Sequence, residues 1–356
     1  MAVLKVLVIR FGGMGDILMA TPSLRAIAER YPDAVIDVVV GGGMTASLEG
    51  HRCVRTIYTF NKRGKDSSFF PFAGFLGRLW RERYDIIINL HPSVKSYLMA
   101  LASRPRRILS FRKTMLAKDG STIHAIDDFA KELRPLGIDS VSDRDMDFDV
   151  PDAAVKNVAN LLDGLGISSG DRIVVINPAA SRPINRWPVE RFRQTALHFV
   201  EMQNTRVLVT GAPSSHRSIM DSLDEVALAA DVCSVDPRVV DLSGKLTVKE
   251  LGALLMRASV FLTCDTGPMH IGAALRTPMV VLSGAADPAR TGPLTDNSIV
   301  LIDRTLSCVP CRDRTCSRGD VKCMDNLSVE QVIRAVDEQL ERTGSSQYVQ
   351  RLRVVS

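Results

Sequence analysis

Two glycine-containing turns constrain the fold of this chain more than any other feature. One is FGGMGD at residues 11–16, after the apolar segment VLKVLVIR; the other begins CDTG at residue 264, after SVFLT. Each turn leads into a helical pattern. A glycine turn between a buried strand and a helix directs free backbone N–H groups at one point, where the helix dipole favours an anion. Two such turns predict two α/β domains facing one cleft that accepts a nucleotide-linked substrate.

Apolar segments alternate with helical patterns along the chain. The segments are continuous, as expected for parallel strands with helices on both sheet faces. They lie at residues 4–10, 35–40, 85–90, 173–176, 207–210, 260–263, 279–282 and 299–302. We predict one helix over 17–30 and helix starts at the capping boxes of Thr247 and Ser328. The expected domains are 1–150 and 151–343, with a tail at 344–356 and a final helix that could pack back on the N-terminal domain.

Composition narrows the class of protein. The chain has 356 residues, 46% of them hydrophobic, and no apolar run of the ~20 residues that a membrane span needs. The N-terminal segment lacks the features of a signal peptide. Seven cysteines, several of them scattered, favour a reducing compartment over a disulfide framework. We therefore expect a cytoplasmic protein.

Positive charge is concentrated in one segment. Residues 55–113 contain thirteen Lys and Arg against three Asp and Glu, a net charge of +10 compared with +5 for the whole chain. Such a cluster attracts polyanions, although each residue alone fits a solvated helix face equally well. The segment predicts an anionic partner for the N-terminal domain.

Three segments together resemble glycosyltransferase family 9, the ADP-heptose:lipopolysaccharide heptosyltransferases. They are FGGMGDILMATPSLRAIAERYP, NPAASRPINRWPVERF, and CDTGPMHIGAAL followed by SGAADPARTGPL. The resemblance implies the GT-B fold, an α/β architecture of two Rossmann-like doubly wound domains facing a central cleft. It also implies inverting transfer of a heptose from ADP-heptose to the lipopolysaccharide inner core, at the cytoplasmic face of the inner membrane. It implies no cofactor for the chemistry, and we expect no nucleic-acid partner.

Asp16 is the candidate catalytic residue. Inverting transfer needs a base beside the acceptor hydroxyl, and a carboxylate at the tip of a glycine turn is exposed and well held. Gly13 and Gly15 let the backbone approach a substrate closely, and we expect both to contact the donor. The alternative is that Asp16 only caps the following helix. The family resemblance favours the general base.

The resemblance places the donor on the C-terminal domain. It assigns contacts with the nucleotide sugar to three groups of residues: Asp265, Thr266, Gly267 and His270; Ser181, Arg182, Asn185 and Arg186; and Lys245 and Leu246. Two positions depart from the family. Asn185 stands where a lysine usually serves the donor phosphates, and Ser215 stands where a glutamate often contacts the ribose. Arg182 or Arg186 could supply the missing charge. A buried structural histidine is the alternative for His270.

Four cysteines form a compact group near the C-terminus: Cys308, Cys311, Cys316 and Cys323. Four thiolates at such spacing could hold a structural zinc ion, although the spacing matches no standard zinc finger. Free thiols and disulfides remain alternatives. In each case we expect a stabilising element and not the catalytic centre.

The partners follow from the family. We expect an ADP-sugar donor and an anionic lipid-linked saccharide acceptor, bound by Lys62, Arg63 and Lys65. The segment 69–80 (FFPFAGFLGRLW) is either a peripheral contact with the inner membrane or a helix packed on the sheet. Alternatives to the heptosyltransferase are a GT-B transferase or epimerase that uses another nucleotide sugar, and a non-catalytic ADP-heptose-binding protein.

Overall fold

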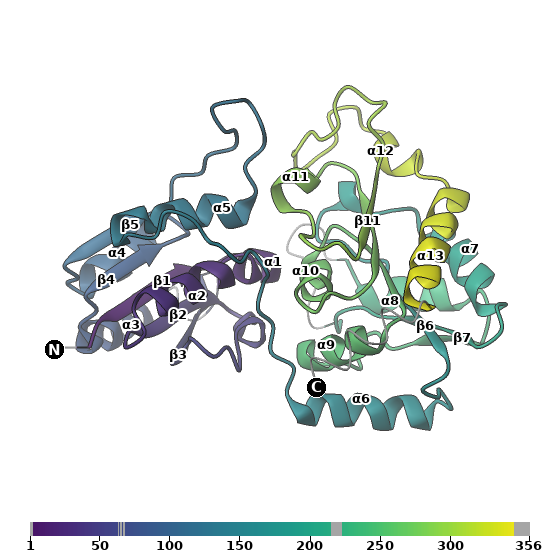
Figure 1. Cartoon of the computed structure of the whole chain (residues 1–356), viewed down its shortest axis with the longest axis horizontal. Helices are drawn as coiled ribbons and strands as arrows, with labels where there is room; N and C mark the ends of the chain where they lie inside the picture. The colour runs from purple at the N-terminus through teal and green to yellow at the C-terminus, as the bar shows by residue number, and fades with distance from the viewer. Residues whose placement is uncertain (1–2, 63, 65, 67, 215–222, 345–356) are drawn as a thin grey trace. The chain divides into compact units, whose positions relative to one another are not determined.

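The computed structural model describes residues 3–62, 64, 66, 68–214 and 223–344. Its contacts divide the chain into two compact units, Met1–Asp149 and Val150–Ser356. Each unit is an α/β layer structure around one parallel sheet (Figure 1).

The N-terminal unit is built on five parallel strands in the order β3-β2-β1-β4-β5. Their bounds are β1 (Lys5–Arg10), β2 (Val35–Gly41), β3 (Thr56–Phe60), β4 (Ile86–Asn89) and β5 (Arg107–Ser110). Because β1 pairs with β4 as well as β2, the turn after β1 lies at the centre of the carboxyl edge of the sheet. Ligands bind at this edge in open α/β sheets.

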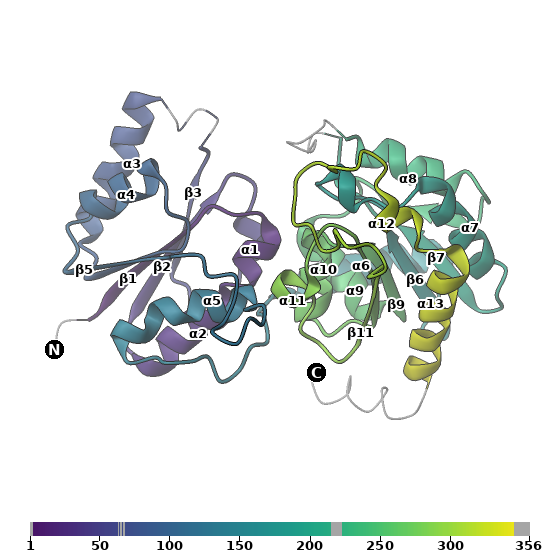
Figure 2. The same cartoon turned by 90° about the horizontal axis from the view of Figure 1, so that it is seen from above.

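Helices cover both faces of this sheet (Figure 2). One face carries α3 (Phe69–Glu82) and α4 (Val94–Ala102), and the other carries α2 (Thr21–Arg30) and α5 (Ala125–Ala130). Alternate strand residues such as Leu7, Ile9 and Ile87 join Phe75 and Met99 in a buried core beneath α3 and α4. The continuous apolar runs therefore arise from burial on both sides of each strand.

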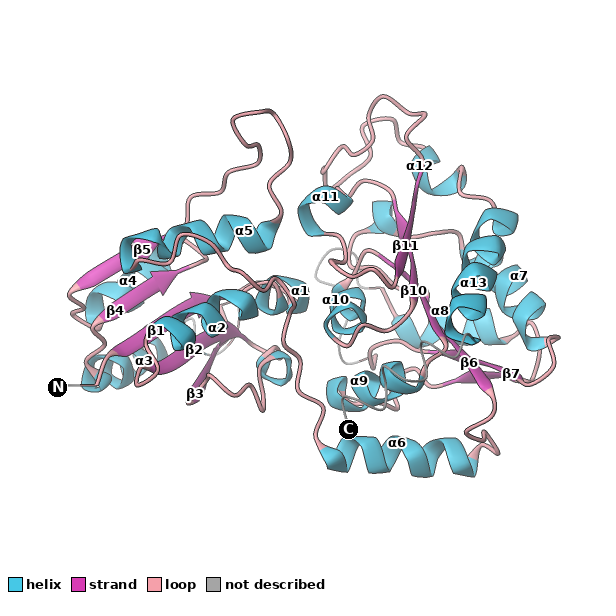
Figure 3. Cartoon of the chain, in the orientation of Figure 1, coloured by secondary structure: helices cyan, strands magenta, loops and turns pink. Residues whose placement is uncertain are grey.

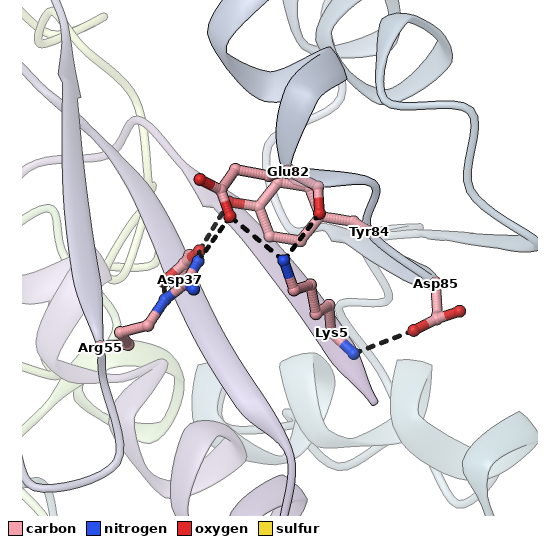
Figure 4. Close-up of polar contacts among 6 residues, drawn as sticks. All are labelled: Lys5, Asp37, Arg55, Glu82, Tyr84 and Asp85. Carbon is pink, nitrogen blue, oxygen red and sulfur yellow. Dashed lines mark hydrogen bonds and ion pairs between the residues drawn. The ribbon is translucent and has the colours of Figure 1, made fainter. Parts of the chain in front are cut away.

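A polar network ties the opposite, amino edge of this sheet together (Figure 4). Arg55 pairs with buried Asp37 and lies 2.9 Å from a carboxylate oxygen of Glu82. The Tyr84 hydroxyl donates to Asp37 at 2.6 Å, and Lys5 donates to Glu82. Arg55 holds the pKa of Glu82 below its usual range. The charge of Glu82 is thus engaged within the network.

The C-terminal unit has six parallel strands in the order β11-β10-β9-β6-β7-β8. They are β6 (Arg172–Asn177), β7 (Thr205–Val209), β8 (Val239–Asp241), β9 (Val260–Cys264), β10 (Met279–Ser283) and β11 (Ser298–Ile302). Because β6 pairs with β9, the loops that follow these two strands lie next to each other at the carboxyl edge.

Helices flank this second sheet as well (Figure 3). They are α6 (Asp152–Gly164), α7 (Val189–Val200), α8 (Glu225–Cys233), α9 (Val248–Arg257), α10 (Gly267–Ala274), α11 (Pro288–Thr291), α12 (Lys322–Asp325) and α13 (Val329–Gly344). Val332, Val336 and Leu340 of the final helix, α13, join the core of the C-terminal unit, beside α7 and β10. Packing of this helix on the N-terminal domain stays a prediction.

Two further differences from the sequence expectations have local causes. The helix expected over 17–30 is divided into α1 (Met14–Leu18) and α2, because Pro22 starts a new helix and the Thr21 hydroxyl donates to the carbonyl of Leu18. Strands β3, β5 and β8 lie outside the expected segments, because β3 and β5 are only partly buried and β8 has three residues. Both capping boxes are present. Among the described residues, no helix is both long and apolar enough to span a membrane.

Candidate functional site

Asp16 lies in the first turn of α1, just past the carboxyl end of β1. Gly13 is the N-cap of α1, and Asp16 sits three positions further on. The alternative that Asp16 caps the helix is therefore not what the structure shows. Its side chain is 43% exposed, so one side of the carboxylate is open to solvent. It is available to a substrate hydroxyl.

Gly12 explains why the turn needs glycine. A Cβ atom at position 12 would lie 2.4 Å from both the Cβ and a carboxylate oxygen of Asp16. Any side chain there would displace Asp16, because real Cβ atoms do not approach so closely. A Cβ at Gly13 would meet nothing within 4 Å. The glycine at position 12 is thus required by the carboxylate itself.

Arg10 holds the Asp16 carboxylate from the protein side. Its Nη2 lies 2.7 Å from Oδ1 of Asp16, and its Nη1 donates to the carbonyl of Leu90 at 2.6 Å. The ring of Phe129 lies under the guanidinium, 4.6 Å from ring centre to Cζ. Arg10 is buried, so the cation is fixed on three sides. A charge-assisted bond from a fixed cation orients the carboxylate.

His91 and Lys62 border the same site. The Phe11 ring, next to the glycine turn, contacts the His91 ring edge-on at 5.7 Å and has Lys62 Nζ 4.4 Å from its centre. Burial lowers the pKa of His91 to about 4, with the cations of Lys62 and Arg10 acting in the same direction. His91 is therefore neutral at pH 7. Of the predicted acceptor residues, Lys62 lies at this site, and Arg63 and Lys65 fall outside the described residues.

The second glycine turn follows β9 in the C-terminal unit. Thr266 is the N-cap of α10, and Gly267 and Pro268 are the first residues of this helix. His270 is buried beneath this turn. Burial raises the pKa of Asp265 to about 6, while the nearby Arg182 acts in the opposite direction. Because β6 pairs with β9, the loops that follow these strands are neighbours, and the charge of Arg182 lowers the pKa of the Asp265 carboxyl.

The loop after β6 carries the second group of residues that the resemblance assigns to the donor. Asn185 is buried in a short 3₁₀ turn, and its Oδ1 has no hydrogen-bond partner among the described residues. The Arg186 Nε donates to the carbonyl of Ala180, within the loop. Ser181 is exposed and Arg182 half-buried. Of the two arginines that could compensate for the lysine, Arg182 is the one coupled to Asp265.

Lys245 and Leu246 lie in the turn between β8 and α9. Gly244 has a φ of +67°, and the Lys245 ammonium donates to the carbonyl of Asp241 at 2.7 Å. This turn is at the same carboxyl edge as the loops after β6 and β9, two strands along from β6. Ser215 is outside the described residues.

The four clustered cysteines line one small cavity. All seven cysteines are free thiols. Backbone N–H groups of residues 318–321 lower the pKa of Cys316, that of Val321 most, while burial raises the pKa of Cys323. Within the described ranges, no three His, Cys, Asp or Glu side chains are arranged to hold a metal ion. The cysteine loop packs on the turn after β10, where a Cβ at Gly284 would lie 3.1 Å from Cys323 Sγ.

Comparison with known proteins establishes the family. The model of glycosyltransferase family 9 (heptosyltransferase) matches residues 74–322. The chain belongs to this family, and it is a glycosyltransferase. The match includes the loops of the C-terminal unit described above, whereas Asp16 and Arg10 precede it.

Curated relatives match this chain over nearly its whole length. A lipopolysaccharide heptosyltransferase 3 of Escherichia coli is 28% identical over 352 residues, 93% of this chain and 98% of the relative. A lipooligosaccharide heptosyltransferase 2 of Campylobacter jejuni is 23% identical over 321 residues, 90% of this chain and 93% of the relative.

Solved structures of family 9 members share the fold. A family 9 glycosyltransferase from Veillonella parvula has a TM-score of 0.82 at 21% identity and covers 96% of this chain and 99% of its own. The heptosyltransferase WaaC of E. coli with ADP has a TM-score of 0.69 at 20% identity, covering 94% of this chain and 100% of its own. These likenesses establish the GT-B fold of the family 9 chain.

Arg10 and His91 were not singled out in the sequence. Arg10 looks like the last residue of an apolar strand, and His91 follows the strand expected at 85–90. The available signal was topological: residues just after adjacent parallel strands meet at one edge. Applying this rule requires knowing that β1 and β4 are neighbours in the sheet, and the sequence alone does not show this.

Proposed function

We propose that this enzyme transfers a heptose from ADP-heptose to an acceptor saccharide of the lipopolysaccharide core, with inversion and with Asp16 as general base. The curated relatives are named for heptosyl transfer to lipopolysaccharide or lipooligosaccharide. The observation that carries the role of Asp16 is its geometry. One side of the carboxylate is fixed by Arg10 and the other side is open.

The chemistry assigned to Asp16 is a single proton transfer. Its carboxylate accepts the proton of the acceptor hydroxyl while that oxygen attacks the anomeric carbon of the heptose. The bond between the anomeric carbon and the diphosphate breaks, and ADP leaves with the electron pair. Asp16 then releases the proton to water. Neutral His91 and cationic Lys62 beside Phe11 are suited to bind an acceptor that carries negative charge.

The donor is assigned to the carboxyl edge of the C-terminal sheet. Backbone N–H groups at the start of α10 and the guanidinium of Arg182 are suited to the diphosphate, whose charge increases as the bond breaks. Asp265 is better suited to sugar hydroxyls than to phosphate, because two anions repel. Burial raises the pKa of Asp265 to about 6, and hydrogen bonds from sugar hydroxyls would stabilise its charged form.

Calorimetric titration with a panel of nucleotide sugars tests the donor assignment. ADP-heptose should bind most tightly, with ADP-glucose weaker and UDP- and GDP-sugars weakest. Arg182→Gln should lower ADP-heptose affinity at least tenfold, since a charge-assisted phosphate contact is lost. A UDP-sugar that binds more tightly than ADP-heptose would favour the alternative of a transferase or epimerase for another donor.

The site of action follows from the acceptor. Because the proposed acceptor is lipid-linked, we place the reaction at the cytoplasmic face of the inner membrane. The positive charge of residues 55–113 is suited to an acceptor rich in carboxylates and phosphates.

A further inference from the structure

Helix α4 is apolar on both of its faces. Val94, Tyr97, Leu98 and Leu101 are 77%, 42%, 43% and 63% exposed. Their spacing of three, four and seven residues places them on one face of the helix. The opposite face buries Met99 and Ala100 in the core. A surface helix normally presents polar residues to water, so this exposed apolar stripe needs a partner.

Helix α3 adds aromatic side chains beside this stripe. Phe69 and Phe70 are 79% and 83% exposed, and their rings contact each other at 5.5 Å. Helices α3 and α4 lie side by side on one face of the sheet (Figure 2). Lys95 Nζ is 6.0 Å from the centre of the Phe72 ring, so the two first turns are neighbours. We call the exposed side chains the α3–α4 face: Phe69, Phe70, Val94, Tyr97, Leu98 and Leu101.

The charge around the α3–α4 face is positive. No Asp or Glu occurs between residues 91 and 113, while this stretch contains six basic residues: Lys95, Arg104, Arg106, Arg107, Arg112 and Lys113. All but Lys95 are exposed. Helix α3 contributes exposed Arg78 and Arg81, and its single acidic residue, Glu82, is engaged by Arg55 and Lys5 (Figure 4).

We propose that the α3–α4 face binds the surface of a lipid bilayer with anionic headgroups. Exposed aromatic and aliphatic side chains with basic neighbours are suited to the boundary between headgroups and acyl chains. A second copy of the chain is a poorer occupant, because pairing two such faces would bring their basic rims together. The proposal deepens the proposed function, on which it rests for the lipid-linked nature of the acceptor.

The α3–α4 face lies next to the edge of the sheet that carries Asp16, so membrane binding there would bring the base close to the lipid surface. Helices α3 and α4 both begin at the carboxyl edge of the N-terminal sheet, the edge at which Asp16 and His91 lie. A bilayer that contacts Phe69, Phe70 and Val94 is therefore next to that edge. Binding would present the base to saccharides that project from the same bilayer.

Vesicle co-sedimentation of the full chain tests the proposal. The protein should sediment with vesicles that contain phosphatidylglycerol and remain in solution with vesicles of phosphatidylcholine alone, and added salt should weaken the binding. The variant Val94→Ser/Leu98→Ser/Leu101→Ser should lose at least tenfold in apparent affinity. The matched control is Val155→Ser/Leu165→Ser/Met256→Ser, which changes three apolar side chains of 38–44% exposure in the C-terminal unit and should bind normally.

Two further measurements separate this proposal from the others. Activity on a delipidated, soluble acceptor should be equal in the wild type and the α4 variant. If the wild type binds vesicles but has no activity on this acceptor, the proposed function is wrong and the membrane-binding proposal stands. If the wild type does not bind vesicles, or if the α4 variant and the C-terminal control variant bind them equally well, the proposal that the α3–α4 face binds a membrane is wrong. A wild-type dimer that the α4 variant dissociates, without vesicle binding, would assign the face to self-association instead.

Discussion

Arg10 fixes Asp16 through a 2.7 Å ion pair, and the same guanidinium is held by the carbonyl of Leu90 and the ring of Phe129. The last residue of β1 thus positions the carboxylate that follows the next turn. The relationship makes Arg10 a positioning residue, since it acts on substrate only through Asp16.

The Arg10 variants should separate positioning from folding. Arg10→Met removes the cation but keeps much of the volume, and kcat should fall by about 10²-fold because the base is no longer held in register. Arg10→Lys keeps a cation and should recover part of the loss. The donor KM should change little in both, as measured by steady-state kinetics.

A double variant provides the control. If Arg10 acts through Asp16, Arg10→Met should cost little in the background of Asp16→Asn, because residues that act as a unit are not additive. Full additivity of the two losses, or a fall in kcat that follows the melting temperature, would assign Arg10 a structural role only.

The two glycine turns and most of the strands could be predicted from the sequence. Each turn has a local cause, since glycine, the apolar run before it and the helix after it are neighbours in the chain. Strands β3, β5 and β8 could not be found in this way, because β3 and β5 are only partly buried and β8 has three residues, so none of them forms a long apolar run. The division between α1 and α2 has a local signal in Pro22, which lies in the first turn of α2.

The site was predictable only where it is local. Asp16, Asp265 and Thr266 lie within the two turns, so their types and positions suggested their roles. Arg10 and His91 join the site because β1 and β4 are adjacent in the sheet. That adjacency is set by packing over the whole unit, and the sequence near either residue carries no sign of it.

Asp265 should make stability depend on pH. Burial raises its pKa from 3.8 to about 6, so between these values the folded state binds a proton that the unfolded chain has released. The free energy of unfolding should therefore fall as pH rises through this window, and Asp265→Asn should remove that slope. At about pH 8 the variant should be more stable than wild type, by about 1–3 kcal/mol.

Melting temperatures of wild type and Asp265→Asn between about pH 5 and pH 8 would measure this effect. The difference should grow with pH in favour of the variant, and ADP-heptose affinity should fall in the same variant. A constant difference across this range would show that the carboxylate is not destabilised by burial.

Salt should act on the acceptor more than on the donor. Screening over a Debye length of about 10 Å at 0.1 M should raise the acceptor KM more than the donor KM. Lys62→Glu/Arg63→Glu/Lys65→Glu should have the same effect with kcat less changed. Lys156→Glu/Arg257→Glu/Arg304→Glu makes an equal change of charge in the C-terminal unit and serves as control. Equal salt sensitivity of both KM values, with an unchanged acceptor KM in the first variant, would show that Lys62, Arg63 and Lys65 only keep the surface soluble.

We propose a structural zinc ion for the cysteine cluster. The four cysteines line one cavity, but no three of the described side chains are placed to hold an ion, so the thiolates would have to move together to bind zinc. Elemental analysis of protein purified without added metal should find about one zinc per chain, and Cys311→Ser should lose it and melt at a lower temperature. Cys53→Ser, away from the cluster, is the control. Absence of metal, with four reactive thiols after unfolding, would reject the site.

The turnover of Asp16→Asn tests the central claim most directly. The substitution keeps the size of the side chain but removes the base, so kcat should fall by about 10²–10⁴-fold while the Kd for ADP-heptose stays nearly unchanged. Asp127→Asn is the matched control, because Asp127 is 44% exposed and paired with Arg144 at 2.6 Å. Near-normal turnover of Asp16→Asn, with soluble acceptor and ADP-heptose, would contradict the assignment of Asp16 as the general base.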